Sequence, residues 1–213
     1  MLNIIIPVLN EESILTENFF YFNQLKLYAN FIFIDGGSID KTVDIATQYG
    51  KVIVSQPGRG VQKNAGVKES SGNQILFMHV DTSITAQTIT TIENLLNNHK
   101  TAGCLQMKIN DSQYIFKIFA AIVNFRAKHL GVIDGDLGLF IHKDLFYELG
   151  QFPQLPYMED IVFSKNLRKF TKIKILPTPI IVSSRKWYTQ GFCTTFFRYM
   201  LAYIQLWTGK LKC

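Results

Sequence analysis

The chain of 213 residues has only three cysteines, and they lie far apart. Cys104, Cys193 and Cys213 show neither metal-ligand spacing nor the even number of a disulfide framework, which argues against a zinc module and a disulfide-stapled secreted domain. No run of about 20 apolar residues occurs, so a conventional membrane-spanning helix is not expected. The first residues, MLNIIIPVLNEES, lack the basic region and cleavage site of a signal peptide. We therefore expect a reduced, cytoplasmic protein.

Acidic residues are missing from the last quarter of the chain. From Ile161 onward there are ten basic side chains and no acidic ones, within a net charge of +6. This asymmetry predicts an anionic partner, such as a phosphate-bearing ligand or acidic lipid. A solvated basic face without a dedicated partner is the alternative. No RNA- or DNA-binding motif accompanies the charge, so nucleic acid is not expected.

Repeats, low-complexity tracts and linkers are also absent, which predicts a single domain over residues 1–190 with an aromatic and basic helical extension over 191–213. Short apolar runs followed by turns predict strands at 2–8, 31–34, 51–55 and 74–79. Helical patterns follow each of these runs, and the first carries Leu15, Phe19, Phe22 and Leu25. Such alternation is typical of an α/β fold with a mixed, mostly parallel sheet flanked by helices on both faces.

Polar or glycine-rich turns follow all four predicted strands. Ligands of open α/β sheets bind beyond the carboxyl ends of the strands, so these turns are expected to share one site. Helix capping is the alternative role for an aspartate in such a turn. The candidate residues of the turns are Pro7, Asn10 and Glu11; Asp35, Gly36, Gly37 and Ser38; Gly58 and Arg59; and His79 and Asp81.

The chemistry of these residues suits a phosphate-bearing ligand. Glycines on both sides of Arg59 allow close backbone approach, and its guanidinium can fork onto a diphosphate. Asp81 is a hard oxygen ligand for Mg²⁺ or Mn²⁺, whereas His79 is either a second ligand or a buried, hydrogen-bonded histidine. Further on, Asp160 of the Glu159-Asp160 pair opens a helical pattern and is a candidate general base. Favourable placement of acids in a first helical turn is the alternative for this pair.

Seven segments carry a recognisable family pattern. The chain resembles family 2-type glycosyltransferases with the GT-A nucleotide-diphospho-sugar transferase fold, and more narrowly the small bacterial subgroup known as radical-SAM/selenodomain-associated transferase 2. The segments appear in family order and are IIIPVLNEE at 4–12, FIDGGSIDKT at 33–42, GRGVQKNAG at 58–66, LFMHVDTSI at 76–84, GDLGLFI at 135–141, FPQLPYMEDIVFSKNLRK at 152–169 and SSRKW at 183–187.

The resemblance implies inverting transfer of a sugar from a nucleotide-diphosphate donor to an acceptor hydroxyl, assisted by a divalent cation. The Pro7–Glu11 turn and Asp35 would contact the nucleoside, and Arg59 and Asn64 would lie near the diphosphate or the base. Asp81 corresponds to the last acid of the family's Asp-x-Asp metal motif. The catalytic base would be Asp160, and Arg185 with Trp187 resembles an Arg-Trp element that closes over the donor diphosphate or the acceptor.

The main departure from the family pattern is His79, which replaces the first acid of the metal motif. It favours one alternative function, a catalytically weak or inactive sugar-nucleotide sensor. The presence of Asp35, Asp81 and Asp160 argues against that alternative. A nucleotidyltransferase is the other alternative, although its longer glycine-rich loop with a nearby basic residue is absent.

The segment 192–207 is expected to form a helix with Phe196, Met200, Tyr203 and Trp207 on one stripe. One interpretation is an interfacial helix on anionic lipid at the inner face of the membrane, which would suit a lipid-linked acceptor. The other, and commoner, arrangement is packing against the protein core or a second subunit, which would make a homo-oligomer. The segment Ile115–Phe125 has the same character and the same two interpretations.

Overall fold

The computed structural model describes residues 1–208, without the side chains of Cys193 and Trp207. An eight-stranded sheet in the order β3-β2-β1-β4-β7-β6-β8-β5 forms its centre. Strand β1 pairs in parallel with β2 and β4, β2 with β3, and β6 with β8, whereas β7 is antiparallel to β4 and β6, and β5 to β8. The mixed, mostly parallel sheet predicted from the sequence is therefore confirmed. The strands are β1 Leu2–Val8, β2 Ala29–Asp35, β3 Lys51–Val54, β4 Gln74–Phe77, β5 Thr82–Ser83, β6 Ala102–Ile109, β7 Phe140–His142 and β8 Lys174–Val182.

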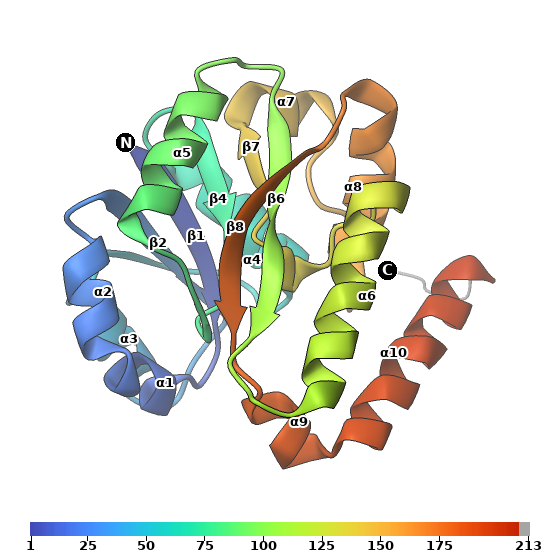
Figure 1. Ribbon diagram of the computed structural model, residues 1–213. Coiled ribbons are helices and arrows are strands. Elements are labelled where there is room, and N and C mark those ends of the chain that lie inside the picture. The colour runs from blue at the N-terminus through green and yellow to red at the C-terminus, as the bar shows by residue number, and fades with distance from the viewer. Residues whose placement is uncertain (209–213) are drawn as a thin grey trace.

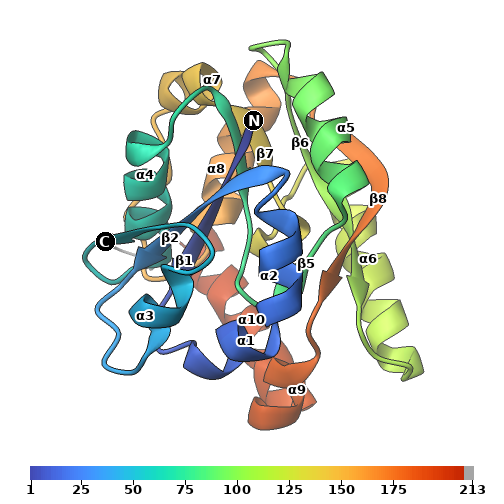
Figure 2. The same ribbon diagram turned by 90° about the vertical axis from the view of Figure 1, so that its left-hand side faces the viewer.

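Helices cover both faces of this sheet (Figures 1 and 2). Side chains alternate along β1, so that Ile4 and Ile6 pack with α1, α2, α3 and α5 on one face, and Ile5 packs with α4, α6, α7 and α8 on the other. The helices are α1 Glu12–Glu17, α2 Phe19–Leu25, α3 Thr42–Ala46, α4 Arg59–Glu69, α5 Ala86–Leu96, α6 Tyr114–Leu130, α7 Lys143–Glu148, α8 Glu159–Phe170, α9 Arg185–Gln190 and α10 Phe192–Trp207, with a 3₁₀ turn η1 at Gly135–Leu137.

The first predicted helix is divided in two. Asn18 separates α1 from α2, and its backbone N–H and its side-chain amide both bond to the Ile14 carbonyl. Such local bonding by asparagine competes with helix continuation, which explains the break. After the break Phe22 is fully buried, whereas Phe19 is 44% exposed and does not share the predicted buried stripe.

The topology brings distant segments to one edge of the sheet. The carboxyl ends of β1, β2, β3 and β4 meet there because these strands are parallel. Strand β7 runs antiparallel to β4, so its first residue lies beside the end of β4 and the Leu139 carbonyl accepts from the Phe77 N–H. The η1 turn immediately before β7 therefore reaches the same edge.

The C-terminal segment folds back along the domain. Helix α10 has the expected bounds and lies beside α6 (Figure 1). Residues 209–213 of the predicted extension, and the Trp207 side chain of its predicted stripe, lie outside the described part of the structure. None of the described helices combines the length and the hydropathy needed to cross a bilayer.

Helix α4 packs directly on β1 and β2 through Gly66. A Cβ atom at this position would lie 2.5 Å from Ile5 Cγ2 and 3.1 Å from Ile34 Cδ1. We expect Gly66→Ala to lower the free energy of unfolding by about 1–3 kcal/mol, since overpacking outweighs the gain of roughly 1 kcal/mol in helix propensity. Urea unfolding measures this loss, with the exposed Lys68→Ala on the same helix as control. An unchanged or higher stability of Gly66→Ala would contradict the close packing.

Candidate functional site

The turns after β1 and β2 form one hydrogen-bonded unit. The Asn10 N–H donates to Ser38 Oγ at 2.8 Å, and Asn10 Oδ1 accepts from the Ile39 N–H at 2.9 Å. The Gly36 N–H also donates to the Val8 carbonyl, which follows Pro7 at the end of β1. Asn10 has a positive φ of 54°, a conformation that asparagine tolerates better than most residues. The predicted residues of these two turns therefore lie together at the edge of the sheet.

The buried Asp35 carboxylate holds its own turn. It accepts hydrogen bonds from the Gly37 N–H at 2.9 Å, the Ser38 N–H at 3.0 Å and Ser38 Oγ at 2.5 Å. Asp35 thus holds its own turn and does not cap α3, whose N-cap residue is Lys41. Contact between Asp35 and a nucleoside stays a prediction.

Gln62 is a positioning residue that the sequence analysis missed. Its buried side-chain amide donates to the Val8 carbonyl at 3.0 Å and to the Ile34 carbonyl at 2.7 Å, and so fastens α4 to the ends of β1 and β2. A Cβ atom at Gly36 would come within 3.2 Å of the Gln62 amide nitrogen. The glycine next to Asp35 is therefore needed for close approach of α4.

The Asn64 amide holds Phe152, and its contact with a donor stays a prediction. Its Nδ2 donates to the Phe152 carbonyl at 2.9 Å, and its Oδ1 accepts from the Phe152 N–H at 3.0 Å. These two bonds attach the loop before α8 to α4. Gly60 allows the same approach, since a Cβ atom there would lie 2.7 Å from the Pro153 carbonyl. Gly58, with φ of 132°, precedes α4 and places Arg59 in its first turn.

A cavity of about 530 Å³ lies between η1, the beginning of α8 and helix α10, and a narrow extension of about 60 Å³ reaches toward β5 and α9. Both spaces are lined by Arg59, His79, Asp136, Lys186 and Tyr199. The larger one adds Glu159 and Asp160, and the smaller one adds Asp81 and Trp187. The structure thus brings the predicted catalytic and metal-ligating residues to one site.

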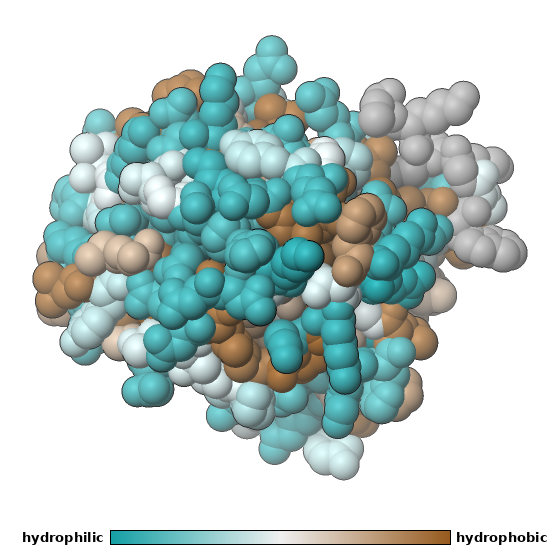
Figure 3. All heavy atoms as spheres, turned by 90° about the horizontal axis from the view of Figure 1, so that it is seen from above, coloured by the Kyte–Doolittle hydropathy of each residue, from teal (hydrophilic) through white to brown (hydrophobic). Residues whose placement is uncertain are grey.

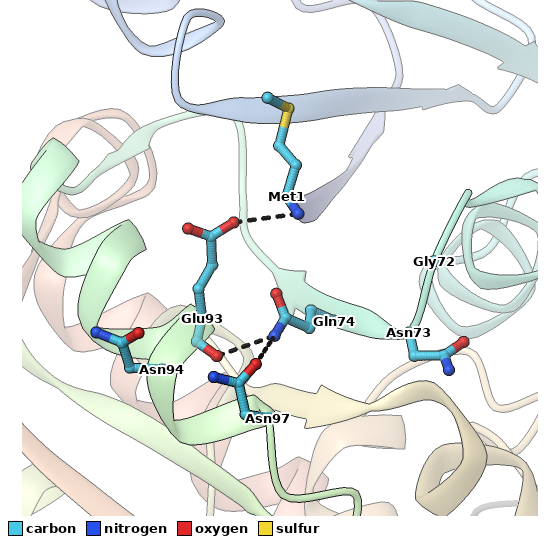
Figure 4. A pocket seen from close by; sticks show the side chains of 7 residues that line it. All are labelled: Met1, Gly72, Asn73, Gln74, Glu93, Asn94 and Asn97. Carbon is cyan, nitrogen blue, oxygen red and sulfur yellow. Dashed lines mark hydrogen bonds and ion pairs between the residues drawn. The ribbon is translucent and has the colours of Figure 1, made fainter.

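A second hollow lies at the opposite edge of the sheet, where the surface is largely hydrophilic (Figure 3). It has about 390 Å³ and lies between the start of β1, the start of β4 and α5. Its polar groups bond to one another: the Met1 amine lies 3.4 Å from Glu93, and the Gln74 amide donates to Asn97 and to the Glu93 carbonyl (Figure 4). It lies at the other end of the strands from Glu159 and Asp160, and none of the predicted site residues lines it.

The carboxylates at the start of α8 share a buried lysine. Lys63 Nζ lies 2.9 Å from Glu159 Oε1 and 2.5 Å from Asp160 Oδ1, and its side chain is 2% exposed. Burial alone would lower the pKa of Lys63, but the two carboxylates raise it, so the lysine stays charged. The same cation outweighs the burial of Glu159 and lowers its pKa. Lys63 was missed because a lysine in a helical pattern is normally solvent-exposed.

Asp160 lines the cavity, and only one of its two carboxylate oxygens is bonded to Lys63. While Oδ1 bonds Lys63, a Cβ atom at Gly135 would lie 2.4 Å from Asp160 Oδ2 and 2.8 Å from His79 Nε2. Gly135 therefore lets η1 approach both side chains. Burial and the Glu159 charge raise the pKa of Asp160 to about 6, although Lys63 and Arg59 oppose the rise. A carboxylate of this basicity is suited to accept a proton near neutral pH.

Two other carboxylates, Asp81 and Asp136, belong to the same site. Burial raises the pKa of Asp81, and the charge of Asp136 raises it further. His79 Nε2 lies 3.7 Å from Asp136 Oδ1, and burial with Arg59, Lys63 and Lys186 lowers the pKa of His79 well below its usual value, so the ring is neutral. Asp136, in the GDLG segment, was not among the predicted site residues.

These groups form only part of a metal site. In the described part of the chain, no three His, Cys, Asp or Glu side chains are arranged to hold a metal ion by themselves. However, Mg²⁺ is typically bound by one or two carboxylates together with substrate phosphates. The hard oxygens of Asp81 and Asp136, which repel each other in one cavity, fit that mode of binding.

The two side chains of the Arg-Trp element, Arg185 and Trp187, lie in different places. Arg185 Nη2 lies 3.4 Å from Glu11 Oε2, and the Arg185 side chain is 47% exposed at the rim. Trp187 is buried against Phe119 and Phe192, with ring centroids 4.8 Å and 4.9 Å away. The intervening Lys186, which was not predicted, lines the cavity and contacts Tyr199 Oη at 3.0 Å.

Removing the buried cation tests the coupling of α4 to α8. We expect Lys63→Met to lower the free energy of unfolding by about 3–5 kcal/mol, because Glu159 and Asp160 would stay buried without a counter-charge. Urea unfolding measures the loss, and the exposed Lys68→Met on the same helix should change stability by less than about 0.5 kcal/mol. Adding Glu159→Gln to Lys63→Met should recover part of the loss. Equal stability of the two lysine variants would contradict the role of Lys63.

Comparisons with known proteins agree with this architecture. Crystal structures of S. aureus TarS residues 1–349, without ligand and with UDP-GlcNAc, match with TM-scores of 0.65 and 0.63 at 21% and 20% identity, covering 86% and 85% of this chain and 60% and 58% of TarS 1–349. The mannosyltransferase PcManGT from Pyrobaculum calidifontis, in complex with GDP-Man and Mn²⁺, matches with a TM-score of 0.62 at 14% identity and covers 84% of this chain and 56% of its own. These likenesses show the GT-A fold.

The present chain therefore spans less than two thirds of the length of these solved structures. No curated protein matches it. The model of the family described as glycosyl transferase family 2 matches residues 3–129, which is more than half of the chain. The chain belongs to glycosyl transferase family 2.

Proposed function

We propose that the protein transfers a sugar from a nucleoside-diphosphate donor to an acceptor hydroxyl in a single inverting displacement, with Asp160 as the general base. The observation that carries this proposal is the Asp160 carboxylate, which lines the cavity and has a raised pKa while Lys63 holds Oδ1 and Oδ2 lies beside Gly135 and His79. In the reaction, Asp160 takes the acceptor proton as the acceptor oxygen bonds to the anomeric carbon. The bond from that carbon to the diphosphate oxygen breaks, and the nucleoside diphosphate leaves.

The donor would extend from the β1–β2 edge to the cavity. Asn10, Glu11, Ser38 and their neighbours in these two turns would contact the nucleoside. The cations of Arg59 and Lys186 would face the diphosphate and stabilise the charge that develops on it.

Asp81 and Asp136 would hold a divalent cation together with the phosphates, with neutral His79 beside them. When bound, Mg²⁺ or Mn²⁺ supplies further charge neutralisation for the leaving diphosphate. The Mn²⁺ and GDP-Man of the PcManGT complex support this reading. As part of the same proposal, the protein would belong to the radical-SAM/selenodomain-associated transferase 2 subgroup of the family.

The sensor alternative depends on His79, which replaces an acid of the metal motif. His79 leaves Asp81 and Asp136 available in the same cavity, and Asp160 keeps the basicity that a sensor would not need. These features favour the transferase. The nucleotidyltransferase alternative gives no reason for a base at the position of Asp160, because that reaction does not require a base in contact with an acceptor there.

Replacement of Asp160 separates chemistry from binding. We expect Asp160→Asn to reduce transfer by about 10²- to 10⁴-fold, the usual contribution of a general base, while donor binding and stability change little because Lys63 remains paired with Glu159. Rates of nucleoside diphosphate release with an active donor and acceptor measure the change. The exposed Asp144→Asn serves as control.

The pH dependence gives this test a second readout. The pKa of Asp160 is raised above its ordinary value to about 6, and the base acts when deprotonated, so kcat/KM should fall as the pH drops through about 6. The residual rate of Asp160→Asn should not show this fall at acidic pH. Transfer by the variant at the rate of the parent protein, or the same fall of kcat/KM at acidic pH, would rule out Asp160 as the base.

Replacement of Asp81 tests the cation. A screen of UDP, GDP, CDP, ADP and dTDP should identify one nucleoside diphosphate that raises the melting temperature of the protein, and raises it more with Mn²⁺ or Mg²⁺. At 100 times its Kd such a ligand stabilises the folded state by about 2.7 kcal/mol. We expect Asp81→Asn to lose the metal-dependent part of the shift and Asp144→Asn to keep it. Retention of the full metal effect by Asp81→Asn would assign the cation to other residues.

A further inference from the structure

Helices α6 and α10 lie side by side and run in the same direction along one side of the molecule (Figure 1). They contact each other near both ends. The ring centroids of Phe116 and Phe192 lie 6.2 Å apart near the beginning of the two helices. Near their ends, Arg126 hydrogen-bonds Tyr203 Oη, which also bonds Asp134 Oδ1 at 3.1 Å. The pair is therefore a fixed part of the fold around the catalytic cavity.

The outer sides of both helices are apolar. The exposed side chains recur every three or four residues, as expected for one stripe on each helix. They are between 42% and 69% exposed. We call them the α6–α10 face, which consists of Ile115, Ile118, Ile122 and Phe125 on α6, and Phe196, Phe197, Met200 and Ile204 on α10.

The two stripes adjoin across the contact between the helices. On α6, Ile122 lies one turn before Arg126, which reaches α10. On α10, Phe196 lies one turn after Phe192, and Met200 lies one turn before Tyr203, and both Phe192 and Tyr203 contact α6. Ile122, Phe196 and Met200 therefore lie within one helical turn of residues that join the two helices. The sequence left open whether Phe196 and Met200 face lipid or pack on protein, and both are exposed in the described chain.

The charges around this face indicate which kind of partner can bind to it. The sequences of α6, α9 and α10 contain no aspartate or glutamate, whereas Lys117 and Lys128 are exposed on α6. The exposed Arg198 of α10 lines the cavity and donates to Gln190. A second copy of the chain would oppose these cations with the same cations. An anionic lipid surface complements them and accepts the apolar side chains between them.

The α6–α10 face also leads to the catalytic cavity. Leu201 is 56% exposed on α10, next to the apolar stripe, and it lines the cavity that contains Asp160. Ile161, Tyr157 and Ala202 line the same space. Apolar side chains therefore line part of the cavity between α10 and the start of α8, where Asp160 lies.

We infer that the α6–α10 face rests on an anionic lipid bilayer, and that the acceptor hydroxyl is carried by an amphiphile held in that bilayer. The apolar part of the amphiphile would pass Leu201 while its polar head reaches Asp160. The identification of the acceptor rests on the proposed glycosyl transfer, whereas the contact with lipid does not. A helix that lies in the interface needs neither the length nor the hydropathy of a membrane span.

The test is sedimentation of the full chain with vesicles of phosphatidylcholine alone and of equal parts phosphatidylcholine and phosphatidylglycerol. We expect binding to the anionic vesicles, weakened by salt. The double variant Ile118→Glu/Phe197→Glu should bind at least about 10-fold more weakly, since two apolar side chains would be replaced by anionic ones. The matched control is Phe20→Glu, which changes an 84% exposed phenylalanine on α2, outside the α6–α10 face.

Three results would overturn the inference: no binding of the parent protein to anionic vesicles, equal binding by the double variant, or equal loss in Phe20→Glu. Sedimentation velocity without lipid provides a separate check. A dimer that the double variant abolishes, without vesicle binding, would assign the face to a second copy of the chain.

The nucleoside diphosphate thermal-shift screen in lipid-free buffer distinguishes failure of the proposed function from failure of the lipid contact. If a nucleotide raises the melting temperature but the protein does not bind vesicles, the proposed glycosyl transfer stands and the membrane contact is rejected. If the protein binds vesicles but no nucleotide raises its melting temperature, the membrane contact stands and the proposed glycosyl transfer is rejected.

Discussion

The buried ion cluster of Lys63, Glu159 and Asp160 is the interaction on which the site depends. Removing charges from water is costly unless each finds a partner, so one lysine within α4 fixes the position of two carboxylates in the first turn of α8. Asn64, one residue further along α4, binds the backbone of Phe152 and fixes the loop that leads to α8. Two adjacent side chains of one helix therefore determine where the proposed catalytic base lies.

This arrangement also sets the basicity of Asp160. Without Lys63, burial and the neighbouring Glu159 would raise its pKa further, and without burial the cation would lower it. One oxygen is in an ion pair with Lys63, and the other lies beside Gly135 and His79, which line the cavity. Around it, Arg59 and Lys186 are cations, and Asp136 lines the same space as Asp81, whose negative charge is disfavoured by burial and by Asp136. A site of this composition is suited to a ligand that brings both negative phosphate and a compensating cation.

The sequence predicts those parts of the structure that depend on local patterns. Apolar runs locate the parallel strands, and the turns after them identify Asp35, Arg59 and Asp81 at one edge. It does not predict the contacts of Lys63 with Glu159 and Asp160, which are 96 and 97 residues away. The family resemblance correctly marks the segment containing Asn64 as important, yet the partner of that amide is 88 residues distant. Helical patterns identify surfaces, but tertiary contacts determine which side chains become buried.

The orientation of helix α10 determines which of its side chains line the cavity and which are exposed. Its inner side, with Thr195, Tyr199 and Ala202, closes the catalytic cavity, and its apolar stripe lies outside. If the stripe packed on the core, as is usual for an amphipathic helix, the polar side would face solvent and the cavity would lose this wall. Because the inner side of α10 is occupied by the cavity and the outer side is apolar, an acceptor in the proposed transfer that entered beside α10 would meet an apolar surface before Asp160. This arrangement is the reason for inferring an acceptor that carries an apolar part next to the reacting hydroxyl.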